Sequence, residues 1–166
     1  MKENTKIYKF YDADDFGTGE YDIAGADYVK LIEACCKHCT FFSLVITNPD
    51  SAILEKLQPF EISKSDVIKF EFDHYDKSAV IVRYYKVSPA LCKAILSQTN
   101  SIFCWINGWR FSNPEDPTFY RDDGSVFFTS TIHEGECTLM VHDEDVSDIV
   151  LGKRWVPITQ GDGSLC

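Results

Sequence analysis

Runs of alternating or β-branched apolar side chains predict the strands of a sheet. Alternation of apolar and polar positions is typical of strands with one buried face, whereas short β-branched and aromatic runs are typical of strands buried on both faces. Residues 67–73 and 79–85 flank a polar turn, so we expect these two strands to face each other. The predicted strands are 6–16, 40–46, 67–73, 79–85, 103–106, 118–120, 126–132 and 137–141.

Apolar residues at three- and four-residue spacing predict helices between the strands. This spacing predicts one helix over 25–38. Ser88 followed by Pro89 predicts the start of a second helix, because serine caps a first turn and proline needs no amide hydrogen bond there. Shorter helices are predicted over 51–57 and near 145–151. The order of elements indicates an α+β fold, in which two longer and two short helices cover one face of a mainly antiparallel sheet.

The chain shows no linker rich in proline or serine that would divide it. We therefore expect a single domain over residues 1–160 and a flexible tail over 161–166, where glycine and serine are concentrated. Residues 25–46 and 89–106 each predict a helix followed by a strand. An internal duplication is an alternative explanation for this shared order, although few residues are identical between the two units.

Composition excludes several classes of function. The 166 residues hold 16 Lys and Arg against 26 Asp and Glu, a formal net charge of −10, which argues against a general nucleic-acid binder or an anionic membrane as partner. Hydrophobic residues make up 45% of the chain, far more than a disordered protein contains. The polar start lacks the apolar segment of a signal peptide, and the seven cysteines are odd in number, so we expect a reducing, cytoplasmic location.

One cluster of cysteines has a spacing that metal and redox sites also use. Cys35, Cys36, His38 and Cys39 include a Cys-x-x-Cys pair and a possible nitrogen ligand. A closed zinc site normally takes a second ligand pair from elsewhere, and the sequence offers none. The cysteines also fall at the end of a predicted helix, where the dipole disfavours a thiolate. We expect buried structural cysteines and no cofactor, with a metal or redox site as the alternatives.

The most catalytic-looking group is the segment 133–136. His133 beside Glu134 and Glu136 offers an imidazole and carboxylates for general base catalysis or metal binding. No nucleophile elbow or metal-protease motif accompanies these residues, and Gly135 suits a polar hairpin turn equally well. A small hydrolase or metal-dependent enzyme is therefore the alternative hypothesis, and we do not expect catalytic residues.

The acidic residues concentrate in predicted turns, which lie on the surface and often carry function. If several of these turns share one end of the sheet, they form a patch that speeds encounter with a basic protein. Trp109, in a predicted loop, is the aromatic residue expected to be most exposed. The predicted partner-binding residues are Asp122, Asp123, Glu134, Glu136, Asp143, Glu144, Asp145 and Trp109.

One stretch resembles a known class of proteins. The Pro-Glu-Asp turn within residues 113–120, the glycine at 124, the aromatic pair at 127–128 and the His-Glu segment within 131–136 resemble small acidic bacterial immunity-like proteins encoded beside polymorphic toxins. The resemblance implies a non-enzymatic cytoplasmic inhibitor that binds a cognate toxin, often a basic nuclease, by charge and shape. Our leading hypothesis is accordingly an immunity-type binding protein with a basic protein partner.

Overall fold

An eight-stranded sheet dominates the computed structural model, which describes residues 5–11, 22–63, 81–105 and 113–143, together with 145, 149, 152 and 155–158. The strand order is β3-β4-β2-β5-β6-β7-β1-β8, and every pair is antiparallel. The predicted antiparallel α+β fold is therefore confirmed. The strands are β1 (Lys6–Tyr11), β2 (Phe41–Ile46), β3 (Glu61–Ile62), β4 (Ile81–Lys86), β5 (Glu115–Tyr120), β6 (Val126–Thr131), β7 (Glu136–Val141) and β8 (Trp155–Ile158).

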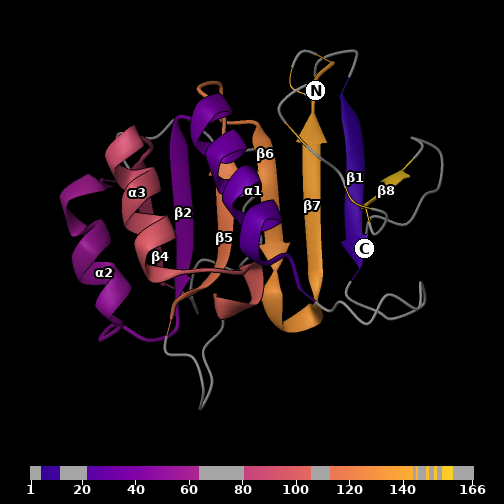
Figure 1. Cartoon of the computed structure of the whole chain (residues 1–166). Helices are drawn as coiled ribbons and strands as arrows, with labels where there is room; N and C mark the ends of the chain where they lie inside the picture. Colours follow the sequence, from indigo (N-terminus) through magenta and orange to yellow (C-terminus); the bar gives the residue numbers. More distant parts are fainter. Residues whose placement is uncertain are drawn as a thin grey trace.

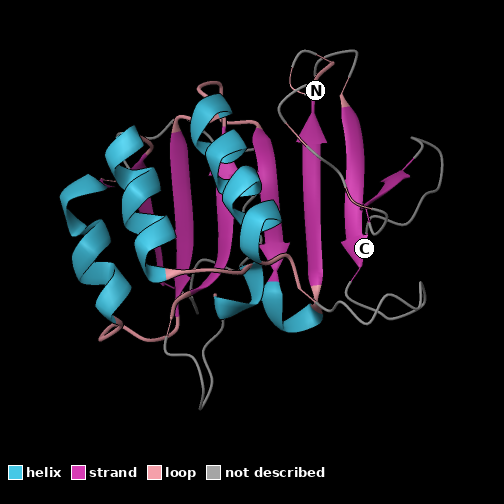
Figure 2. Cartoon of the chain, viewed as in Figure 1, coloured by secondary structure: helices cyan, strands magenta, loops and turns pink. Residues whose placement is uncertain are grey.

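Three helices lie side by side against one face of this sheet (Figures 1 and 2). They are α1 (Gly25–His38), α2 (Ala52–Leu57) and α3 (Pro89–Gln98). Helix α3 begins as its sequence predicts, because the Ser88 hydroxyl accepts a hydrogen bond from the Leu91 amide at 3.1 Å. Three short 3-10 turns complete the described elements: η2 (Gln58–Phe60), η4 (Ile102–Cys104) and η5 (Ile132–Glu134).

Aromatic side chains fill the space between the helices and the centre of the sheet. The ring of Phe42 on β2 stacks on Phe119 of the neighbouring strand β5 at 4.5 Å and meets the Trp105 ring at 6.0 Å. Polar side chains within this core bond one another: the Trp105 indole donates to the Tyr28 hydroxyl at 3.0 Å, and the Tyr28 and Thr99 hydroxyls form a hydrogen bond at 2.6 Å. This network joins α1 to the segment that follows α3.

The segment after α3 differs from the prediction. Residues 103–106 were expected to form a strand, but Ile102–Cys104 forms the 3-10 turn η4 instead. The Ser101 and Asn100 amides donate to the Cys104 sulfur at 3.2 and 3.4 Å, which closes a tight turn rather than an extended segment. The second helix–strand unit therefore lacks its strand, and the proposed duplication of 25–46 in 89–106 has no structural counterpart.

The remaining predictions have different outcomes. Some elements are confirmed, some observed elements were not predicted, and other predicted elements lie outside the described residues. Helix α1 has the predicted bounds, and both turn glycines, Gly124 and Gly135, adopt positive φ angles of 83° and 68°. Strand β8, which pairs with β1, was not predicted from its sequence. The predicted strand 67–73, most of the predicted helix near 145–151 and the proposed tail lie outside the described residues. No helix in the described part of the chain has the length and apolar character needed to cross a membrane.

Two isoleucines provide a matched test of this core. Ile95 on α3 is fully buried, whereas Ile81 on β4 is 66% exposed. We expect Ile95→Ala to lower the free energy of unfolding by about 2–5 kcal/mol, because it leaves a cavity that the small gain in helix propensity does not offset. Ile81→Ala should change it by less than about 0.5 kcal/mol. Urea denaturation followed by circular dichroism measures both, and equal losses would contradict the helix layer described here.

Candidate functional site

The antiparallel strands send the described turns to two opposite ends of the sheet (Figure 1). One end holds the β5–β6 turn, the end of β7 and the end of α1. The other end, at the bottom of Figure 1, holds the end of β2, the start of β5, the β6–β7 turn and the start of α1. We call the second one the acidic end, defined by Asp22, Asp27, Asp50, Glu115, Asp116, Glu134 and Glu136.

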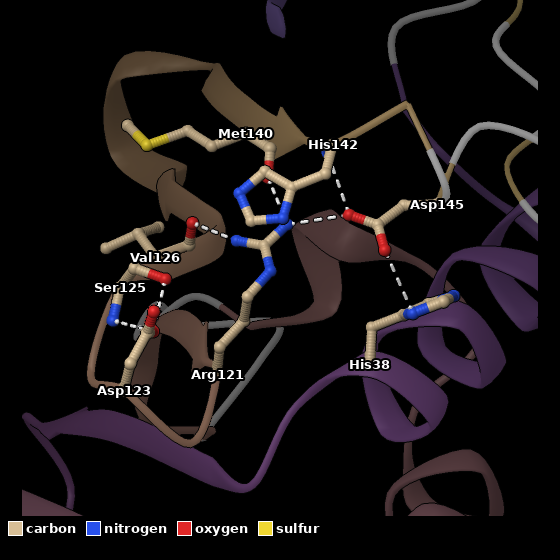
Figure 3. Close-up of polar contacts among 8 residues, drawn as sticks. All are labelled: His38, Arg121, Asp123, Ser125, Val126, Met140, His142 and Asp145. Carbon is tan, nitrogen blue, oxygen red and sulfur yellow. Dashed lines mark hydrogen bonds and ion pairs between the residues drawn. The ribbon is translucent and has the colours of Figure 1, made fainter. Parts of the chain in front are cut away.

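The first end is organised around a buried arginine (Figure 3). The Arg121 guanidinium donates to the Val126 carbonyl at 2.9 Å, to the Met140 carbonyl at 2.7 Å and to Asp145 Oδ2 at 2.8 Å. Asp145 Oδ1 lies 3.1 Å from Nδ1 of His38, the last residue of α1. These contacts join the β5–β6 turn, the end of β7 and the helix layer at a single point.

Arg121 and Asp145 stabilise each other inside the protein, at 7% and 4% exposure. Burial by itself raises the pKa of Asp145. The hydrogen bond from the His142 amide, the hydrogen bond and charge of Arg121 and the charge of His38 outweigh that effect, so the pKa lies below its ordinary value. The carboxylate is therefore ionised and paired at neutral pH, and this cluster serves as a structural clamp.

The acids at this end that were predicted to bind a partner differ from one another in exposure and in their contacts. Asp122 and Asp123 are exposed, and Asp123 accepts the amide and hydroxyl of Ser125 at 3.0 and 2.6 Å within the turn. The carboxylate of Asp143 lies 2.7 Å from the Lys6 ammonium. Asp145 is buried in the clamp rather than exposed on the surface. Glu144 and Trp109 lie outside the described residues.

Charge at this end is close to balanced. The described acids Asp122, Asp123, Asp143 and Asp145 are matched by the cations Lys6, Lys37, Lys86 and Arg121, and Glu61 at the start of β3 pairs with Arg83 at 3.7 Å. At the acidic end, seven acids are described, and the Nζ of Lys9 lies 3.7 Å from Oε2 of Glu136. Within the part of the chain that the structure describes, the surplus of acids over cations therefore lies at the acidic end, to which Glu134 and Glu136 of the predicted binding residues belong.

A β-bulge at the start of β5 arranges the centre of the acidic end. The β2–β5 register shifts between Ser43 and Val45, so that β5 holds one more residue than β2 over this stretch. Asp116 lies in the bulge with a φ of 53°, a left-handed conformation that costs an L-residue roughly 1–2 kcal/mol. The hydrogen bond from the Ile132 amide to Asp116 Oδ1, at 2.8 Å, holds its buried carboxylate against η5.

His133 on η5 has a different carboxylate neighbour from the one predicted. Its Nδ1 lies 3.7 Å from Oε2 of Glu115, whereas Glu134 is exposed and Glu136 pairs with Lys9. The predicted pairing of His133 with Glu134 or Glu136 is therefore replaced by one with Glu115. Sequence spacing could not show this pairing, because Glu115 is 18 residues away from His133. The sequence feature that marks Glu115 is the Glu-Asp pair between two prolines, and this pattern predicted only a turn.

The cysteine cluster does not form a ligand set. Burial raises the pKa values of the Cys35, Cys36 and Cys39 thiols, so all three are protonated and weakly nucleophilic at neutral pH. His38 faces Asp145. Among the described residues, one group of at least three His, Cys, Asp or Glu side chains has its possible ligand atoms within 4.8 Å of one another. This group is Glu115, Asp116 and His133.

Comparison with known proteins does not place the chain in a family. No protein-family model, curated protein or solved structure matches it. The resemblance of residues 113–136 to immunity-like proteins therefore stays a prediction, and the functional argument rests on the geometry of the two ends.

The clamp predicts how stability depends on pH. The ordinary pKa of an unfolded aspartate is about 3.9, and that of folded Asp145 lies below it. Its contribution to stability is therefore fully present above the unfolded pKa and is lost as the pH falls through the folded pKa. We expect Asp145→Asn to lower the free energy of unfolding at neutral pH by about 3 kcal/mol, because it leaves Arg121 buried without its counter-charge.

The measurement is chemical denaturation at a series of pH values from about 7 to 2. The difference between wild type and Asp145→Asn should shrink toward the acid end of the series. Asp143→Asn is the matched control, since Asp143 is exposed and two residues away. A deficit that stays constant with pH would contradict an ionised, paired Asp145.

Proposed function

We propose that this chain is a non-enzymatic, cytoplasmic binding protein of the immunity type, which neutralises a toxin-like protein by binding a basic surface of it. The observation that carries the proposal is the separation of charge between the two ends of the sheet. Seven described acids lie at the acidic end, whereas the described acids of the other end are matched by described cations. A field of one sign on one end steers a partner of opposite charge and orients it on arrival.

The acidic end has the rigidity that a recognition surface needs. Its carboxylates come from segments far apart in sequence, and the ends of β5, β6 and β7 hold several of them in fixed positions. Asp27 is in the first turn of α1, where a carboxylate also interacts favourably with the helix dipole. A surface that is already ordered loses little conformational entropy when a partner binds.

The buried thiols support binding over catalysis. Their raised pKa values leave Cys35, Cys36 and Cys39 protonated, and the one histidine in the clamp is bonded to a carboxylate that already neutralises Arg121. The imidazole of His133 is half exposed and lies beside Glu115 on the open edge of the acidic end. These features suit a surface that presents charge more than one that activates a nucleophile.

Charge-matched variants of the two ends test the proposal. The acidic-end variant is Asp27→Asn, Glu134→Gln and Glu136→Gln combined, and the control variant is Asp122→Asn, Asp123→Asn and Asp143→Asn combined. Both remove three negative charges. We expect the acidic-end variant to slow association with the partner on the order of tenfold at low salt and to weaken the salt dependence of the rate, whereas the control changes the rate little.

The partner for these measurements is obtained by capture from a lysate of the native host, with wild type and both variants as baits, and association is then followed by stopped-flow fluorescence. Equal rates for the two variants would show that net charge acts without a defined surface. A loss confined to the control variant would move the interface to the other end and contradict the proposal.

The immunity role has its own test. The reading frame beside the gene is expressed alone and together with this chain, and growth of the host is measured. We expect the neighbouring product, or its basic C-terminal domain, to arrest growth and this chain to restore it. A harmless neighbour, or growth arrest that this chain does not relieve, would refute the immunity role.

A further inference from the structure

We propose that Glu115, Asp116 and His133 form a binding site for a divalent transition-metal ion such as Zn²⁺ or Mn²⁺. This inference goes beyond the proposed function, because it concerns the free chain and needs no partner. The ligand atoms of all three side chains lie within 4.8 Å of one another, and His133 Nδ1 is 3.7 Å from Glu115 Oε2. The site lies at the centre of the acidic end, where β5 starts and η5 follows β6.

The distances between the ligand atoms fit a bound metal ion after small side-chain movements. Ligand atoms bound about 2.0–2.2 Å from Zn²⁺ in a tetrahedral site lie about 3.3–3.6 Å apart. The 3.7 Å between His133 and Glu115 is close to this value. The remaining gaps are closed by side-chain rotation of His133, whose imidazole is 51% exposed, together with rotation of Glu115 toward Asp116, and neither moves the strands.

The ligand set selects the class of ion. One imidazole nitrogen with two carboxylates suits Zn²⁺, Fe²⁺ or Mn²⁺, whereas Ca²⁺ and Mg²⁺ prefer oxygen ligands alone. Three protein ligands leave at least one coordination position for water. The exposed side of His133 gives an ion in solution access to that position.

The scaffold holds the ligands before an ion arrives. Successive side chains of a regular strand point to opposite faces, which would separate Glu115 from Asp116. The bulge and the positive φ of Asp116 change this alternation and bring both carboxylates to His133. The Ile132 amide bonds Asp116 Oδ1, an outer contact of the type that orients metal ligands, and the carboxylate retains lone pairs for coordination.

An ion at this site would also alter the acidic end. Each divalent ion adds two positive charges among seven acids, so it lowers the local negative potential by a large fraction. A bound metal ion and a cationic partner would then weaken each other's binding through electrostatic repulsion. A structural ion bound far from the acidic end would have no such effect.

The test measures metal binding to the chain purified without metal. Isothermal titration with Zn²⁺ should give one ion per wild-type chain, and His133→Gln and Glu115→Gln should each weaken the affinity at least about tenfold. Glu134→Gln is the matched control, because it removes an exposed carboxylate next to His133 and should leave the affinity within about twofold. Asp116 is not varied, since its carboxylate holds η5 in place.

Two spectroscopic readouts identify the ligands without relying on activity. Substoichiometric Mn²⁺ should broaden the imidazole proton resonances of His133 before those of His38 and His142. Co²⁺ bound to the wild type should show no sulfur-to-metal charge-transfer band. Absence of binding at millimolar Zn²⁺, unchanged affinity in His133→Gln and Glu115→Gln, or a thiolate band would each overturn the site; none of them bears on the immunity role, which the growth assay tests separately.

Discussion

Burial of the central strands on both faces is the constraint on which the distribution of charge depends. All six residues of β2 are buried, as are the last five of β5 and the first five of β6. An unpaired charge is strongly disfavoured in such positions, so ionised side chains in the middle of the sheet are confined to its outer strands. The acids of the central strands and their turns must therefore lie at the two ends of the sheet.

The two ends use their carboxylates in different ways. At one end Asp145 is buried against Arg121 and His38, and its carboxylate pairs with both side chains and so joins α1, β5 and β7. At the other end Asp116 is buried as well, but it bonds a backbone amide and lies beside a second carboxylate, Glu115. The first arrangement joins three elements through an ion pair, whereas the second holds a β-bulge against η5.

Periodicity predicts most of the fold because local spacing determines it. Helix α1 and the capped start of α3 follow from apolar spacing and from Ser88-Pro89, and the hairpin glycines follow from their need for positive φ. Turn η4 escapes prediction because aromatic residues 103 and 105 resemble a strand, while the bonds to the Cys104 sulfur that bend the chain leave no periodic signal.

The functional residues are harder to predict because they depend on register. Acidity located in turns is visible in the sequence, but which turns meet is decided by strand order: Glu134 and Glu136 lie at the acidic end, and Asp122 and Asp123 lie at the other. Asp145 could not be recognised as buried, since its partners Arg121 and His38 are 24 and 107 positions away. The pairing of Glu115 with His133 likewise requires the β-bulge, which has no sequence signature of its own.

The bulge at Asp116 connects backbone strain to the proposed metal site at the acidic end. A left-handed conformation is unfavourable for aspartate, and a fold selected for stability alone would favour glycine or asparagine there. Strain of this kind persists where the surrounding structure over-determines it, and here the Ile132 amide and the paired strands do so. A cationic group placed beside Glu115 and Asp116 would interact favourably with both carboxylates, whether it is a metal ion or a basic side chain of a partner. The two proposals thus concern the same end of the sheet but different groups: the metal site uses Glu115, Asp116 and His133, whereas partner binding uses the charge of the whole acidic end.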